Sequence, residues 1–109
     1  MTDASFVQVM TTIDSVEAAR ALADEIVRQR LAACVQLIGP IESHYWWNGE
    51  IETATEWLCL IKTHRRQTER LTNTISELHS YDVPEVTVTD IVGGHPPYLE
   101  WIRSETRER

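Results

Sequence analysis

His44-Tyr45-Trp46-Trp47-Asn48-Gly49-Glu50 is the stretch of sequence that decides the fold. Asn and Gly accept positive φ at the two central positions of a type I′ turn, so Asn48-Gly49 predicts a two-residue β-hairpin. The second arm, 51–63, contains no Gly or Pro, and at about 3.3 Å per residue it spans roughly 40 Å. A compact domain of this size has a radius of gyration of only about 13 Å. We therefore expect the hairpin to extend beyond its own globule and to be covered by another molecule.

The turn also sets the pairing between the two arms. A two-residue loop pairs residues whose numbers sum to 97, which places Cys59 opposite Ile38, about 13 Å along the strand from Cys34. Gly39-Pro40 predicts a bulge or bend in the first arm, because proline has no N–H for the ladder. Unless that bulge shifts the register, the two thiols are too far apart for a disulfide, and we expect both to be reduced and to pack in the core.

The remaining periodicity predicts a ferredoxin-like α+β plait formed by residues 1–109 as a single domain. Asp14 and Glu17 resemble a capping box at the start of the first helix. In chain order we expect a strand over 6–12, a helix over 15–30, the hairpin arms 32–47 and 51–63, a helix over 65–79, a strand over 86–92 and a terminal helix from Pro97. This βαββαβ order puts both long helices on one face of an antiparallel sheet.

The segment 57–61 is apolar on both of its alternating faces, although the helices can cover only one face. Nearer the turn, Glu52, Thr53, Thr55 and Glu56 are polar, and we expect them to reach solvent or a polar interface. Another subunit is the simplest cover for the second apolar face, so the sequence predicts an oligomer.

Composition excludes several classes of function. The formal net charge is −7 with a pI near 5.0, so no general cationic field recruits nucleic acid. The sequence has no apolar run near the ~18 residues needed to span a bilayer and no secretory signal pattern, which predicts a cytoplasmic protein without membrane association. Catalytic motifs such as a phosphate loop or a nucleophile elbow are missing, and we do not expect an enzyme.

Five motifs occur in order: Leu31-Ala32-Ala33-Cys34-Val35, Tyr45-Trp46-Trp47-Asn48-Gly49-Glu50-Ile51-Glu52, Ile61-Lys62-Thr63, Glu77-Leu78-His79-Ser80-Tyr81-Asp82-Val83-Pro84-Glu85 and Tyr98-Leu99-Glu100-Trp101. Together they resemble the CutA divalent-cation tolerance family. The resemblance runs from the first strand through the last helix. It implies a tight homotrimer whose long hairpins wrap neighbouring subunits, with an architecture similar to that of PII-type signal proteins.

The resemblance also implies tolerance of copper and other divalent cations, without a cofactor that the fold requires. The proposed metal ligands of copper-binding members correspond to Met10, Leu78 and His79 here. Met10 offers a soft thioether and Leu78 offers no donor, so His79 is the main candidate ligand for Cu(II) and Met10 a weak additional contact. Without the family, His79 would be interpreted as a residue that caps the second helix.

A second candidate site is a cleft between subunits that binds an anionic small molecule. Lys62 opens a locally basic stretch, 62–70, and Tyr81 and Glu85 could complete such a cleft. The alternative is that these charges form a solvated face. The aromatic residues 45–47 suit either an interface or a ligand cage, and we favour the interface.

Two functions therefore remain open. The first is a cytoplasmic homotrimer that binds or responds to divalent metal ions, copper among them. The second is a PII-like trimeric sensor or scaffold that binds an anionic ligand and contacts a partner protein.

Overall fold

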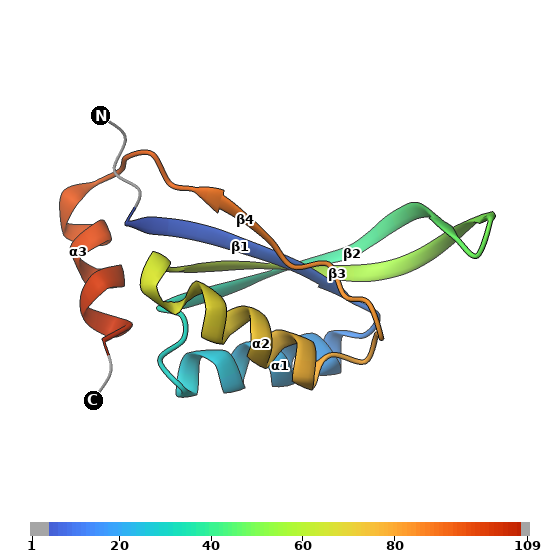
Figure 1. The fold of residues 1–109 in the computed structure, drawn as a ribbon, viewed down its shortest axis with the longest axis horizontal. Coiled ribbons are helices and arrows are strands. Elements are labelled where there is room, and N and C mark those ends of the chain that lie inside the picture. The colour runs from blue at the N-terminus through green and yellow to red at the C-terminus, as the bar shows by residue number, and fades with distance from the viewer. Residues whose placement is uncertain (1–4, 108–109) are drawn as a thin grey trace.

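The computed structural model describes residues 5–107 and has the predicted element order (Figure 1). The elements are β1 (Phe6–Ile13), α1 (Val16–Arg28), β2 (Cys34–Trp47), β3 (Glu50–His64), the 3₁₀ turn η1 (Arg65–Gln67), α2 (Thr68–Leu78), β4 (Thr87–Asp90) and α3 (Pro96–Glu105). The predicted ferredoxin-like plait with a long hairpin and a C-terminal helix is confirmed.

The four strands form an antiparallel sheet in the order β2-β3-β1-β4. Helices α1 and α2 cover one face of this sheet, and α3 stands at the end opposite to the hairpin tip (Figure 1). The core fills the layer between sheet and helices with apolar side chains, among them Val7, Val9, Leu22, Ile26, Ile61, Leu71 and Ile75. The other face of the sheet, which α1 and α2 do not cover, is called the open face below.

Helix α1 begins one residue later than the sequence predicted. Ser15, not Asp14, is the N-cap residue: its backbone is extended, and its hydroxyl accepts a hydrogen bond from the Ala18 N–H at 3.1 Å. Serine is as good an N-cap as aspartate, so the local sequence offered two equivalent starts.

The hairpin turn is as predicted, but the register beyond the bulge is not. Asn48 and Gly49 have φ of 50° and 77°, and Trp47 pairs with Glu50. A bulge between Ile38 and Ile41 then shifts the pairing by one residue, so Cys59 lies opposite Leu37 rather than Ile38.

The two cysteines lie on opposite faces of the sheet. Cys59 is buried in the core beneath the helices, whereas Cys34 pairs with Lys62 on the open face and is half-buried. Both are free thiols. Core packing is thus confirmed for Cys59, whereas Cys34 lies outside the main core.

The hairpin projects well beyond the rest of the fold (Figure 1). The principal extents are 44 × 30 × 22 Å, and the radius of gyration is 14.6 Å, above the ~13 Å typical of a compact chain of this size. Large apolar side chains remain exposed on the hairpin, with Trp46 71% and Ile51 65% accessible. Leu58 and Leu60 occupy the open face, where they are half-buried, so the expectation of apolar residues on both faces is confirmed.

Candidate functional site

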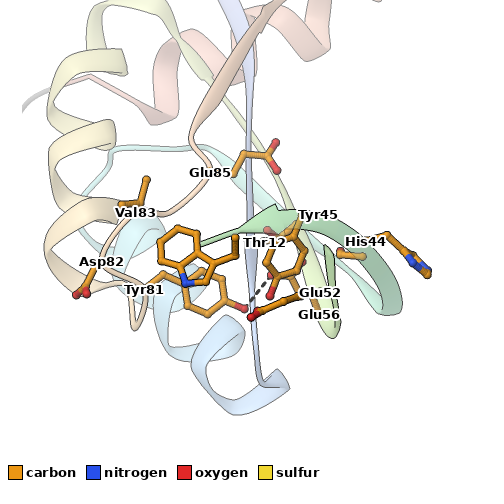
Figure 2. Close-up of a pocket in the computed structure, with 11 residues that line it drawn as sticks. Thr12, His44, Tyr45, Glu52, Glu56, Tyr81, Asp82, Val83 and Glu85 are labelled. Atoms are coloured by element: carbon orange, nitrogen blue, oxygen red, sulfur yellow. Dashed lines mark hydrogen bonds between the residues drawn. The ribbon is translucent and has the colours of Figure 1, made fainter. Parts of the chain in front are cut away.

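A pocket of about 630 Å³ lies where the hairpin leaves the globule and meets the segment that follows α2 (Figure 2). It is lined by three aromatic residues, four carboxylates and four other side chains. These are Tyr45, Trp47 and Tyr81; Glu52, Glu56, Asp82 and Glu85; and Thr12, Ser43, His44 and Val83. A volume of this size is typical of sites for small molecules.

Strand alternation explains why one face of the hairpin carries both the aromatic and the acidic residues. Tyr45 and Trp47 are two residues apart on β2, so they project to the same side. Tyr45 pairs directly with Glu52 on β3, and directly paired residues share a face. Glu56 lies four residues further along β3, again on that side. The segment 81–85 then closes the pocket from across the end of β1.

Glu56 is the most buried carboxylate of the site. The residue is only 6% exposed within one chain, which corrects the expectation that it reaches solvent; its place at a polar interface stays a prediction. The Tyr81 hydroxyl donates to its Oε2 at 2.8 Å, and the dashed line in Figure 2 marks this hydrogen bond. Burial, and then the hydrogen bond to Glu56 and its negative charge, raise the pKa of Tyr81 above its usual value.

The second carboxylate oxygen of Glu56 has no hydrogen-bond donor within residues 5–107, and no basic side chain of that range forms an ion pair with it. Among the residues that the structure describes, the pocket lining contains no lysine or arginine. Its one histidine, His44, is engaged with Glu42 at 2.7 Å. The pocket therefore carries uncompensated negative charge.

His79 lies beside the pocket and anchors the segment that closes it. Its Nδ1 accepts the Tyr81 N–H at 3.0 Å, so the ring proton sits on Nε2, which donates to the Thr12 carbonyl oxygen at 2.7 Å. The ring also packs against Tyr81, with 4.7 Å between centroids. Both nitrogens are engaged with backbone groups, and His79 ties the end of α2 to β1.

The structure does not bring the predicted metal ligands together within one chain. Met10 lies on the open face, between Leu60 of β3 and Thr87 of β4, and does not line the pocket. Leu78 is half exposed. Across the described residues, no group of three or more His, Cys, Asp or Glu side chains is arranged to hold a metal ion.

The three residues predicted for the anion cleft are also separated within one chain. Tyr81 and Glu85 line the pocket, whereas Lys62 lies on the open face and donates a hydrogen bond to Gln36. The neighbouring arginines point toward the α3 end, where Arg65 pairs with Asp90 and Arg66 donates to the Arg103 carbonyl oxygen.

Sequence reasoning missed Glu52, Glu56 and Asp82 as residues of the pocket. For Glu52, a usable signal was present, because the hairpin register pairs it with Tyr45. For Glu56, no local signal was usable, because the contact that places it in the pocket is the hydrogen bond from Tyr81, 25 residues away in the chain.

The fold and the pocket define a ferredoxin-like α+β protein with a site of small-molecule size at the base of its hairpin. Residues 7–105 match the family model of the CutA1 divalent ion tolerance protein. The chain belongs to this family.

The chain is 39% identical over 98 residues to the divalent-cation tolerance protein CutA of Thermus thermophilus, which covers 90% of this chain and 95% of that protein. It is 44% identical over 100 residues to the chloroplastic protein CutA 1 of Oryza sativa, covering 92% of this chain and 56% of the rice protein. The chain thus spans about half the length of the plant proteins that it matches. The crystal structure of CutA1 from Oryza sativa superposes with a TM-score of 0.94 at 41% identity, with both chains fully covered.

No helix within residues 5–107 is both long enough and apolar enough to cross a membrane.

Proposed function

We propose that this chain is a homotrimeric binding protein, rather than an enzyme, that acts in divalent-cation tolerance and takes up a cation. The observation that supports a cation is the pocket, whose lining in the described part of the chain has four carboxylates and no lysine or arginine. Such a lining concentrates cations and repels anions. The family name supports the link to divalent ions.

Copper is the metal for which a specific ligand is proposed. Imidazole suits Cu(II), and His79 is the histidine at the position that the family pattern indicates. To bind copper, one ring nitrogen must give up its backbone partner: Nδ1 releases the Tyr81 N–H, or Nε2 releases the Thr12 carbonyl oxygen and its proton moves to Nδ1. Met10 supplies no more than a weak contact, because a thioether prefers Cu(I).

Calorimetric titration with CuCl₂ and with MnCl₂ tests this function on the wild type, His79→Ala and the control His95→Ala. His95 is exposed at the start of α3 and makes no side-chain capping bond. Copper bound at His79 predicts an affinity loss of about tenfold or more in His79→Ala, with no change in His95→Ala. Equal copper affinity in all three proteins would remove His79 from the site, and absence of binding by either metal would contradict a direct role in metal binding.

A second candidate function is a trimeric sensor or scaffold whose ligand is a small molecule. The observation that favours it is the volume of the pocket, about 630 Å³, together with its aromatic walls. The anionic ligand expected from the sequence stays a prediction for a cleft between subunits, because within one chain Lys62 lies apart from the pocket and the pocket lining is acidic.

The cytoplasm remains the proposed compartment. Its support is the chemistry of the two cysteines, which are free thiols on opposite faces of the sheet.

A further inference from the structure

We propose that the pocket binds a small organic cation, an amine or quaternary ammonium head group, with Glu56 as its charge partner and the rings of Tyr45, Trp47 and Tyr81 as its walls. This inference rests on the second candidate function and names the class of ligand for it.

Glu56 is nearly enclosed and incompletely paired within the described part of the chain. As a residue, Glu56 is only 6% exposed, its second oxygen is not among the fully buried atoms without a partner and so opens to the pocket, and buried charges in proteins are ordinarily paired. One oxygen has a single donor, the Tyr81 hydroxyl, and the other has none within residues 5–107. Because the side chain lines the pocket, a cation that enters there can supply the missing partner.

Aromatic rings form part of the pocket wall. The faces of Trp and Tyr rings attract a cation through their quadrupole, and they do so most strongly when the cation is desolvated. Three such rings line a pocket that also holds a buried carboxylate. A combination of aromatic faces and carboxylates is the usual chemistry for recognising alkylammonium groups.

The size of the pocket and the spacing of its donor groups favour an organic cation over a metal ion. The pocket, at about 630 Å³, is far larger than a bare divalent ion needs. In the described part of the chain, no three carboxylate, imidazole or thiol groups converge as a metal site requires. Divalent ions need several oxygen donors at about 2.0–2.6 Å, whereas an ammonium group needs one carboxylate and apolar or aromatic contact.

Isothermal titration with choline and with 3,3-dimethylbutan-1-ol at matched ionic strength tests the inference. The two molecules have nearly the same shape, but the second replaces the quaternary ammonium with a neutral tert-butyl group. We expect choline to bind the wild-type protein at least about tenfold more tightly than the alcohol. Glu56→Gln keeps the side-chain size and an acceptor for Tyr81, and it should remove most of this preference.

The control is Glu77→Gln, which makes the same change in net charge on an exposed position of α2. It should bind choline as the wild type does. Circular dichroism establishes that Glu56→Gln is folded. If it is not, Glu52→Gln provides a second test, because Glu52 is exposed and lines the same pocket; it should also weaken choline binding.

The outcomes distinguish this inference from the proposed functions. Equal binding of choline and the alcohol, or unchanged choline binding in both Gln variants, would overturn it. Binding of MnCl₂ without binding of choline would also overturn it while leaving the cation-tolerance function intact. If choline fails to bind and Glu56→Gln destabilises an oligomer, Glu56 is paired with a second copy of the chain, and the inference is again wrong.

Discussion

Cys59 shows how one buried side chain makes the stability of this fold depend on pH. The thiol is packed between the sheet and the helices, with 1% of the residue exposed. Burial raises its pKa from 9.0 to about 11, because the thiolate would lose its hydration in the core. The unfolded chain therefore releases this proton at a lower pH than the folded protein does.

The sign of the effect follows from this difference. The stabilising contribution of the protonated thiol is fully present below pH 9, and it is lost as the pH rises from 9 toward about 11. We expect the free energy of unfolding to fall across this window by up to about 1.4 kcal/mol per pH unit. Urea unfolding under reducing conditions, at pH 8 to 10.5, measures this slope.

The free energy of unfolding of Cys59→Ala should fall less steeply with pH than that of the wild type. Cys34→Ala, which changes a half-buried residue of the open face, should keep the wild-type slope. Identical slopes in the wild type and Cys59→Ala would contradict the assignment. Tyr81, whose pKa is also raised by burial and by Glu56, adds to the loss only above about pH 10.

At the scale of elements, the bulge in β2 packs against the side chain of Trp57. A Cβ atom at Gly39 would lie 2.3 Å from Cδ1 of Trp57 and 2.7 Å from its Cγ. These atoms belong to the rigid indole, so the whole ring would have to move. The glycine thus lets Trp57 lie against the bulge while it packs on the core.

Gly39→Ala should therefore destabilise the fold by about 1–3 kcal/mol, the usual cost of overpacking. Thermal or urea unfolding measures the effect. Gly93→Ala is the matched control, because a Cβ there meets no atom within 4 Å. Equal unfolding midpoints for the two variants would show that Trp57 moves aside without cost.

The hairpin also shows which features could be predicted from the sequence. The turn at Asn48-Gly49 is encoded by two adjacent residues, and it was predicted correctly for that reason. The pairing of Cys59 was wrong by one residue, because the size of the bulge at 39–40 depends on how Trp57 packs. Burial of Glu56 and the bonds of His79 depend on Tyr81 and Thr12, which only the folded chain brings near.

At the scale of the whole molecule, the projecting hairpin and the apolar open face favour assembly. Trp46 and Ile51 stand opposite each other near the hairpin tip and are the most exposed large side chains there. A monomer would leave this apolar ribbon in water, which is unfavourable for a soluble domain. The trimer that the family resemblance implies is the assembly we expect.

Multi-angle light scattering at micromolar concentration should show a single trimeric species for the wild type. Trp46→Glu should shift this species toward smaller forms, because a carboxylate placed in a covered apolar contact costs several kcal/mol, roughly 3 or more. Val27→Glu is the control, since Val27 is 42% exposed on α1 and lies outside the hairpin. It should remain trimeric. A folded wild-type monomer, or a Trp46→Glu protein that assembles as the wild type does, would mean that the hairpin is not what holds the subunits together.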